Sequence, residues 1–325
     1  MAADSPPMIE RMNHLGAARR PFLFVIDFEM RKPIILPLDD IDPREVSFDI
    51  RGVRNCPPAI PNRARSHIGK HPVSYARYLD AFNHVVACQR AGDSYLCNLT
   101  FPTRIETNLS LEDIFHRAVA PYRLMLRGMC TVFSPEPFVR VRGGVISSYP
   151  MKGTTRADEP GAEAKLLADE KEFAEHLTIV DLIRNDLGIV ARNVRVERFR
   201  YVEKVSTARG DLLQTSSEIT ARLPEDWRER IGEIVAALLP AGSVTGAPKK
   251  RTVEIIREAE GAERGWYTGI FGVFDGNDLD SAVMIRFIER TESGLFYRSG
   301  GGITVYSDPE SEYQELIDKV YVPAG

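Results

Sequence analysis

The chain has 325 residues, of which 43% are hydrophobic and 27% charged, a composition typical of folded globular proteins. Its formal net charge of −4 gives no general reason to expect nucleic acid as a partner, and no apolar stretch is long enough to span a bilayer. The first residues lack the apolar core of a signal peptide, and the four cysteines include no C-x-x-C pair. These features predict a cytoplasmic protein with reduced thiols, without a membrane or nucleic-acid partner, and argue against a zinc site.

The order of the expected elements indicates the fold class. Residues 1–20 are polar and contain prolines, which predicts a loosely ordered lead-in before a single domain over residues 21–325. Apolar periodicity and turn residues predict helices over 74–91, 162–187 and 227–239, a short helix from Ser110, and helices from about residues 248 and 308. They predict strands over 22–28, 94–106, 129–150 (a hairpin), 194–205, 268–274, 280–290 and 294–298. Strands come in runs without regular βαβ alternation, which predicts an α+β fold with largely antiparallel sheet.

Two of the expected helices each carry a pair of glutamates three residues apart. Glu172 and Glu175 lie in the long helix, and Glu312 and Glu315 lie in the last one. Residues at this spacing share one helix face, so each pair presents two carboxylates together. Such an oxygen-rich set suits Mg²⁺, although the same spacing is common on solvated helix surfaces. Spacing alone leaves both interpretations open.

One glycine-rich loop is similar to a phosphate-binding P-loop but lacks two of the residues that such a loop requires. In the segment AGSVTGAPKK, Ala247 and Pro248 stand where a P-loop needs glycine and lysine. A nucleotide phosphate is therefore not expected. Backbone N–H groups at the start of the following helix could still bind a carboxylate, or could simply form a plain helix terminus.

A second glycine-rich segment follows one of the last strands. Gly300, Gly301 and Gly302 would let the backbone approach a ligand closely, or would form a bulge. Nearby, Arg286 lies in an apolar strand, where a long cation needs an anionic partner. That partner could be a carboxylate of the protein or of a ligand.

Seven segments together resemble the chorismate-utilising enzymes, a family that includes aminodeoxychorismate, anthranilate, isochorismate and salicylate synthases. The segments occur in the family's order and run from about Gly92 to Lys319: GDSYLCNLT, FSPEPF, YPMKGTTR, EHLTIVDLIRNDLG, LLPAGSVTGAPK, RGWYTGIFG and SGGGITVYSDPESEYQE. Each is weak evidence alone, but the ordered set is specific. The resemblance implies one α+β domain in which two large antiparallel sheets stack and helices surround them.

The resemblance also implies a magnesium site. Glu175 and Glu315 match positions that ligate Mg²⁺ in the family, and Glu172 and Glu312 match partners that act through water. The ion would hold a carboxylate of chorismate. The matches thus favour metal ligands over surface charges for both glutamate pairs.

Other matches imply contacts with the substrate. Positions that grip its second acidic group, or lie near its ring, match the following residues: Thr245, Tyr267, Arg286 and the backbone of Gly300, Gly301 and Gly302. Glu136, in SPEPF, matches the general acid that protonates the departing C4 hydroxyl. Glu203 stands where the family often has histidine, and the sequence assigns it no role.

Lys152 distinguishes the members of the family. KGT at this position is the signature of aminodeoxychorismate synthases, whereas the other members carry alanine. The resemblance implies that the lysine amine adds at C2 of chorismate as the C4 hydroxyl leaves, and that ammonia then adds at C4 and expels the lysine. An amine can act as both nucleophile and leaving group if it is neutral when it attacks, which we expect desolvation to favour.

The implied product is 4-amino-4-deoxychorismate, on the route to 4-aminobenzoate and folate. We expect ammonia to come from a separate glutamine amidotransferase subunit, because the chain contains no recognisable glutaminase motif. Leu96 stands where isochorismate and salicylate enzymes carry a lysine base, so anthranilate synthase is the leading alternative and isochorismate synthase the next. A non-catalytic homologue is a further alternative, which the joint presence of Glu136, Lys152, Glu175 and Glu315 disfavours.

Overall fold

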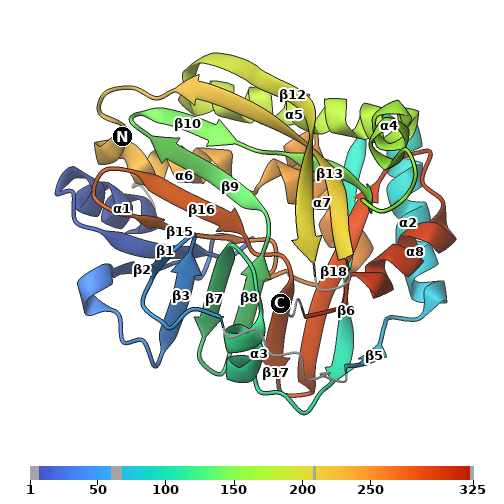
Figure 1. Cartoon of the computed structure of the whole chain (residues 1–325), viewed down its shortest axis with the longest axis horizontal. Helices are drawn as coiled ribbons and strands as arrows, with labels where there is room; N and C mark the ends of the chain where they lie inside the picture. The colour runs from blue at the N-terminus through green and yellow to red at the C-terminus, as the bar shows by residue number, and fades with distance from the viewer. Residues whose placement is uncertain (1–6, 60–67, 208–209, 323–325) are drawn as a thin grey trace. The chain divides into compact units, whose positions relative to one another are not determined.

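Two large antiparallel sheets form the framework of the computed structural model, which describes residues 7–59, 68–207 and 210–322 (Figure 1). The chain divides into two compact units, and each sheet belongs to one of them. Unit 1 comprises Met1–Ile41, Glu136–Gly242 and Gly269–Val283. Unit 2 comprises Asp42–Pro135, Ser243–Thr268 and Met284–Gly325. The expected α+β class with two large antiparallel sheets and accompanying helices is therefore confirmed.

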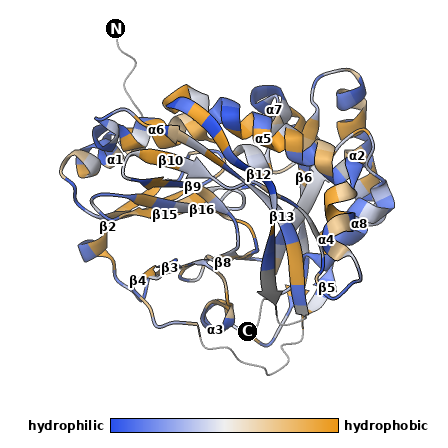
Figure 2. Cartoon of the chain, turned by 45° about the horizontal axis from the view of Figure 1, so that its top comes forward, coloured by the Kyte–Doolittle hydropathy of each residue, from blue (hydrophilic) through white to orange (hydrophobic). Residues whose placement is uncertain are grey.

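The sheet of unit 1 has the strand order β11–β13–β10–β9–β16–β15–β1–β2, and β12 pairs with β13. Its strands are β1 (Phe22–Ile26), β2 (Ile34–Pro37), β9 (Pro137–Arg142), β10 (Val145–Ser148), β11 (Met151–Arg156), β12 (Arg192–Thr207), β13 (Gly210–Arg222), β15 (Ile270–Phe274) and β16 (Leu279–Val283). Strands β1 and β15 are buried along their whole length, and β15 is coloured mainly as hydrophobic in Figure 2. These strands form the core of the unit.

The helices of unit 1 are α1 (Pro7–Ala17), α4 (Ala162–Ala168), α5 (Glu170–Val190) and α6 (Ile231–Leu238), with short 3₁₀ turns at η1 (Leu38–Asp40) and η2 (Trp227–Arg230). Helix α5 packs along β11, β12 and β13, and α6 packs against α1 and α5. The carboxylate of Asp169 accepts a hydrogen bond from the backbone of Glu172 and so caps α5. This cap divides the expected 162–187 helix into α4 and α5.

The sheet of unit 2 has the order β14–β6–β18–β17–β8–β7–β3–β4, and β5 pairs with β6. Its strands are β3 (Val46–Ile50), β4 (Val53–Arg54), β5 (Gly69–His71), β6 (Leu96–Glu106), β7 (Tyr122–Leu126), β8 (Cys130–Ser134), β14 (Gly246–Ala247), β17 (Phe287–Thr291) and β18 (Gly294–Ile303). The helices are α2 (Tyr75–Arg90), α3 (Leu111–Arg117), α7 (Lys249–Glu260) and α8 (Pro309–Asp318); the 3₁₀ turn η3 (Gly242–Val244) spans the sequence boundary with unit 1. Side-chain caps from Ser74, Ser110 and Asp308 explain where α2, α3 and α8 begin.

Two expectations about the chain differ from the structure. Pro7–Ala17 forms helix α1, whereas the sequence indicated a loosely ordered lead-in; residues 1–6 lie outside the described residues. Met8, Met12 and Leu15 are buried along one side of α1, and this burial stabilises a helix that local composition did not reveal. The expected single strand over 280–290 is two strands, because β16 belongs to unit 1 and β17 to unit 2.

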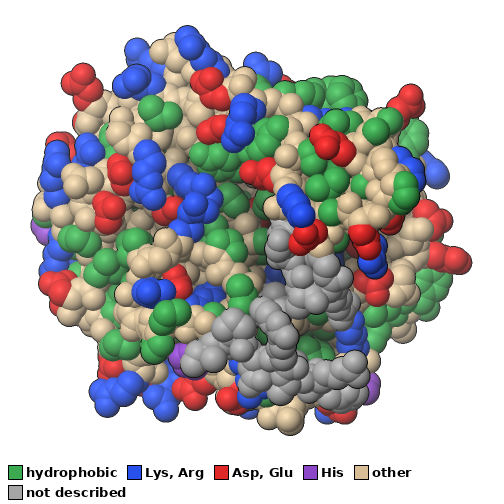
Figure 3. All heavy atoms as spheres, viewed as in Figure 1, with side chains coloured by type: hydrophobic (Ala, Val, Ile, Leu, Met, Phe, Trp, Pro, Cys, Tyr) green, Lys and Arg blue, Asp and Glu red, His purple; other side chains and the backbone are tan. Residues whose placement is uncertain are grey.

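The expected hairpin turn at residues 143–144 is confirmed, with β9 and β10 paired on either side of it. None of the helices in the described part of the chain has the length and apolar character that a membrane crossing requires. On the face shown in Figure 3, basic and acidic side chains are interspersed with apolar ones. The chemistry of the molecule must therefore be sought in particular side chains.

Candidate active site

Lys152 lies on β11 and faces the carboxylate of Glu175 on α5. Its Nζ donates a hydrogen bond to Glu175 Oε2 at 3.3 Å, and the two side chains are 23% and 11% exposed. Within the described residues, the Lys152 amine makes no other hydrogen bond or ion pair. The amine is therefore half-withdrawn from solvent and has a single anionic partner.

A bulge places these groups. The pairing of β11 with β13 shifts register between Lys152 and Thr154, and Gly153 between them has a left-handed backbone with φ of +75°. A Cβ at Gly153 would lie 3.0 Å from Leu166 Cδ1 and 3.3 Å from Glu172 Oε2. The missing side chain lets the Glu172 carboxylate lie close to the strand.

His176 follows Glu175 and has no solvent exposure. Its Nε2 lies 2.6 Å from Ser217 Oγ, and that hydroxyl also accepts a hydrogen bond from the backbone N–H of Arg200. Burial, together with the positive charges of Arg200 and Lys152, lowers the pKa of His176 to about 4. The imidazole is neutral near pH 7. Sequence reasoning missed this residue, because a histidine inside a helical pattern gives no sign that it is buried.

Two further residues of unit 1 were singled out in the sequence. Glu136 immediately precedes β9, its backbone carbonyl accepts a hydrogen bond from the N–H of Val283, and the residue is partly buried. Glu203 on β12 is exposed and accepts a hydrogen bond from Ser216 Oγ at 2.7 Å. Glu136 thus belongs to the same unit as Lys152, whereas Glu203 already has a hydroxyl partner on the neighbouring strand.

In unit 2, the second glutamate pair lies on α8 beside the glycines of β18. A Cβ at Gly301 would lie 3.1 Å from Glu312 Oε2 and 3.9 Å from both Glu315 Oε1 and Lys319 Nζ. Lys319 Nζ lies 2.5 Å from Glu315 Oε1 and donates to the carbonyl of Gly300 at 2.8 Å. The structure therefore adds Lys319 to the candidate site. Its spacing of four residues from Glu315 was the available signal, but such helical pairs are common.

The three glycines of β18 differ in what they require. A Cβ at Gly300 would lie 2.2 Å from the carbonyl oxygen of Leu99, so this position excludes any side chain. Gly301 faces the α8 carboxylates, and Gly302 pairs with Asn98 of β6. The run is thus explained by close approaches on both sides of the strand.

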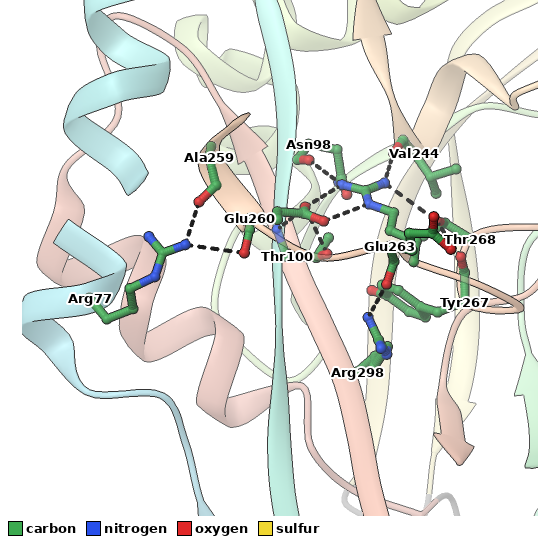
Figure 4. A network of polar contacts seen from close by, with 11 residues as sticks. Arg77, Asn98, Thr100, Val244, Ala259, Glu260, Glu263, Tyr267, Thr268 and Arg298 are labelled. Atoms are coloured by element: carbon green, nitrogen blue, oxygen red, sulfur yellow. Dashed lines mark hydrogen bonds and ion pairs between the residues drawn. The ribbon is translucent and has the colours of Figure 1, made fainter. Parts of the chain in front are cut away.

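Thr245, Tyr267 and Arg286 also lie in unit 2. Thr245 is fully buried, and its carbonyl accepts a hydrogen bond from the backbone N–H of Asn98 at 2.8 Å. Tyr267, labelled in Figure 4, is 4% exposed, and burial raises the pKa of its hydroxyl to about 12. Its phenol therefore stays neutral and can donate a hydrogen bond.

Arg286 has no carboxylate partner in the part of the chain that the structure describes. Its guanidinium lies 5.3 Å from the centre of the Tyr321 ring, and Tyr297 and Tyr267 also lie close to it. An arginine among tyrosines can bind an anion without first breaking an ion pair. Arg286 is thus available to hold a ligand's carboxylate.

The sequence-predicted residues fall into two sets, one in each unit. Unit 1 holds Glu136, Lys152, Glu172 and Glu175; unit 2 holds Thr245, Tyr267, Arg286, Gly300, Gly301, Gly302, Glu312 and Glu315. Within the residues that the structure describes, no three His, Cys, Asp or Glu side chains gather closely enough to form a metal site by themselves. The donor chemistry nevertheless fits Mg²⁺, because each unit offers carboxylates beside a glycine that leaves room for them.

The family model for chorismate binding enzymes matches residues 39–325. The chain belongs to this family. The matched range includes every residue discussed above as part of the candidate site. It confirms the expectation of a chorismate-utilising enzyme.

Relatives in the family share much of the chain. A protein of Haemophilus influenzae, named as an uncharacterized PabA-like protein, is 50% identical over 315 residues, which cover 97% of this chain and 96% of the relative. Component 1 of aminodeoxychorismate synthase from Salmonella typhimurium is 37% identical over 259 residues, covering 75% of this chain and 56% of its own length. The chain therefore matches little more than half of that enzyme.

Solved structures agree with the family. Anthranilate synthase component I from Streptococcus pneumoniae superimposes with a TM-score of 0.66 at 29% identity, covering 78% of this chain and 58% of that one. A putative isochorismate synthase from Bacillus anthracis gives a TM-score of 0.69 at 20% identity, covering 95% and 84%. The second similarity shows the fold alone.

Proposed function

We propose that this enzyme converts chorismate and ammonia into 4-amino-4-deoxychorismate. The observation that carries the proposal is the Lys152 amine, which is half-buried on β11 and has Glu175 as its only polar partner in the described residues. A lysine in this setting can become a nucleophile, because it is shielded from water and loses only one contact when it reacts. The similarity to aminodeoxychorismate synthases supports the same assignment.

The proposed reaction has two displacements. The Lys152 amine forms a bond to C2 of chorismate while the ring double bonds shift and the C4 hydroxyl leaves as water, with a proton supplied by Glu136. Ammonia then forms a bond to C4, the double bonds shift back, and the C2–nitrogen bond to Lys152 breaks. The net change replaces the C4 hydroxyl with an amino group, so one ammonia is consumed and one water is released. An amine suits both steps because it is a good nucleophile and, once protonated, a good leaving group.

Glu175 sets a condition on this chemistry. Glu175 holds the amine by a hydrogen bond at 3.3 Å, and this contact must break before the nitrogen can attack carbon. We propose Mg²⁺ as the cofactor, held by Glu175 and Glu315 and, through water, by Glu172 and Glu312. When bound, the ion would supply positive charge that neutralises Glu175 and would hold a substrate carboxylate. Lys152 would then be released from its carboxylate partner.

The remaining residues are proposed to bind the substrate. Arg286 would pair with its second acidic group, because it lacks a carboxylate partner in the described part of unit 2. Tyr267 would donate a hydrogen bond from its neutral phenol, and the backbone of Gly300–Gly302 would approach closely. Thr245 would lie near the ring. We further propose that a separate glutamine amidotransferase subunit delivers the ammonia.

Anthranilate synthase is the second candidate, because relatives of this chain include anthranilate synthase component 1 of Aquifex aeolicus, 40% identical over 195 residues. Identification of the product decides between the two. Purified protein would be incubated with chorismate, Mg²⁺ and ammonium, with and without added aminodeoxychorismate lyase. We expect 4-aminobenzoate only when the lyase is present. Anthranilate formed without the lyase would overturn the proposal, and an unchanged chorismate concentration would favour a non-catalytic homologue.

A further inference from the structure

Arg264 lies in the connection between α7 and β15 and is 1% exposed, yet all of its N–H groups have acceptors. Nε and Nη2 donate to the two carboxylate oxygens of Glu260 at 3.0 and 2.6 Å. Nη1 donates to the Val244 carbonyl at 2.7 Å and to Thr268 Oγ1 at 3.3 Å, and Nη2 also donates to the Asn98 carbonyl at 2.6 Å. Figure 4 shows these acceptors converging from separate segments of unit 2.

Glu260 fixes the orientation of the guanidinium. It lies at the end of α7, and its Oε1 also accepts hydrogen bonds from the backbone N–H and the hydroxyl of Thr100, both at 2.9 Å (Figure 4). A buried ion pair whose remaining lone pairs are satisfied in this way holds one geometry, because any displacement would strand a charge away from water. Arg264 is therefore anchored to β6 and α7 and presents its other N–H groups in fixed directions.

One of these N–H groups binds the segment that contains Thr245. Arg264 binds the carbonyl of Val244, the preceding residue, and the Thr245 carbonyl accepts from the N–H of Asn98. Arg264 also binds the carbonyl of Asn98. The carbonyl before Thr245 is thus tied to β6 through the guanidinium, and the carbonyl of Thr245 itself is tied to β6 directly by Asn98.

A second N–H group of Arg264 binds Thr268, which connects it to the segments of Tyr267 and Arg286. Thr268 has φ of +59°, an unfavourable backbone for a β-branched residue, and is 1% exposed. Its Oγ1 accepts from Arg264 and donates to the Tyr267 carbonyl at 2.6 Å, and its N–H donates to the Met284 carbonyl at 2.9 Å. Met284 begins the segment that reaches Arg286, whose own φ is +52°. The surrounding contacts hold this strained backbone in place.

We propose that Arg264 is a positioning residue that sets the three substrate-binding segments of unit 2, those of Thr245, Tyr267 and Arg286, in register with one another. Thr268 is the link between the guanidinium and the last two. This inference rests on the assignment of those segments to substrate binding in the proposed function. It adds Arg264 and Thr268, which would not bind substrate themselves. Loss of either would let the substrate-binding segments move apart.

The experiment compares Thr268→Val, which keeps the shape and removes the hydroxyl, with Thr268→Ser, which keeps the hydroxyl. We expect Thr268→Val to raise the KM for chorismate about 10-fold with kcat changed less than 3-fold, because a charged donor loses its acceptor. Thr268→Ser should restore most of the affinity. Equilibrium binding of chorismate, measured by calorimetry, should change in parallel with KM.

Arg264→Lys and Arg123→Lys form a matched pair. Arg123 is also 1% exposed and pairs with Asp49 at 2.7 Å in unit 2, but it lies on β7 and contacts none of the three substrate-binding segments by any hydrogen bond or ion pair described for it. Both variants should lower the melting temperature, whereas only Arg264→Lys should raise KM, by about 10-fold or more. If Arg264→Lys does not fold, the Thr268 pair decides.

Two results would overturn the inference: KM unchanged in both Thr268→Val and Arg264→Lys, or KM raised equally by Arg123→Lys. The proposed function fails separately. If the unaltered protein binds and consumes chorismate but releases anthranilate, the reaction is wrong while the positioning role stands. If it releases 4-amino-4-deoxychorismate and the variants keep its KM, only the positioning role is wrong.

Discussion

Each unit of the molecule contains a lysine paired with the second glutamate of an E-x-x-E helix, but the two pairs are built differently. In unit 1, Lys152 comes from strand β11 and reaches Glu175 on α5, with both side chains largely withdrawn from solvent. In unit 2, Lys319 lies one helical turn beyond Glu315 on the same chain segment, and the Glu315 side chain is 53% exposed. The first pair depends on tertiary structure, and the second forms locally.

The first glutamates of the two helices are alike. Glu172 and Glu312 each lie close to a strand at a glycine, Gly153 or Gly301, where a Cβ would approach the carboxylate to 3.3 and 3.1 Å respectively. In both units the absence of a side chain on the strand lets a carboxylate lie against it. The resemblance therefore lies in the glycine and the first glutamate, and the difference lies in the lysine.

That difference indicates different roles for the two amines. Lys319 binds both Glu315 and the Gly300 carbonyl, so it is held in place as a cation. Lys152 has Glu175 alone among the described residues, so removal or neutralisation of one carboxylate would release it. A fixed cation suits the binding of an anion, whereas an amine with a single partner suits nucleophilic attack.

Replacement of Lys152 should have the largest effect. Lys152→Ala should lower the rate of 4-amino-4-deoxychorismate formation about 1000-fold or more, since removal of a covalent nucleophile abolishes the step that it performs. The measurement is the lyase-coupled assay for 4-aminobenzoate at saturating Mg²⁺ and ammonium. Lys165→Ala, at an exposed position on α4, is the control and should keep full activity. An unchanged rate and product in Lys152→Ala would rule out the covalent route.

Replacement of any of the four glutamates should shift the dependence of activity on Mg²⁺ in the same direction, but by different amounts. Glu172→Gln and Glu312→Gln should each raise the Mg²⁺ concentration for half-maximal activity about 10-fold. Glu175→Gln and Glu315→Gln should each raise it further. Titration of Mg²⁺ after treatment with a chelator measures this directly, and Glu163→Gln on the exposed side of α4 is the control. Equal Mg²⁺ dependence in all five variants and the unaltered protein would show that the carboxylates do not hold the ion.

Local patterns in the sequence account for much of the fold. Runs of strands without βαβ alternation indicated an α+β fold with largely antiparallel sheet, and E-x-x-E spacing correctly placed each glutamate pair on one helix, α5 or α8. The division into two sheets was implied only by the family resemblance. The metal role of these glutamates, and the catalytic role of Lys152, stay predictions. Residues whose importance depends on burial or on contacts distant in the sequence could be found only in the structure, because apolar periodicity and residue spacing do not report burial.

Three cases show what the sequence could not supply. The expected strand over 280–290 passes from one sheet to the other, and alternation of apolar residues gives no sign of which sheet a strand joins. His176 and Arg264 are buried by elements that are distant in the sequence. Lys319 was overlooked because a lysine four residues after a glutamate usually forms an ordinary surface pair.

The smallest expected effect tests the similarity of the two glycines. Gly153→Ala should destabilise the protein by about 1–2 kcal/mol from its left-handed backbone alone, and by more because Leu166 and Glu172 must also move. Gly128→Ala is the matched control, since Gly128 has φ of +69° but no atom within 4 Å of its would-be Cβ. Gly301→Ala carries no such backbone penalty and should mainly displace the flexible end of Glu312. Denaturant unfolding should therefore rank the losses Gly153→Ala, Gly128→Ala, Gly301→Ala, while Mg²⁺ dependence should change in the first and last only. If Gly301→Ala left that dependence unchanged, the likeness between the two glycine–glutamate contacts would be structural without a shared role in holding the ion.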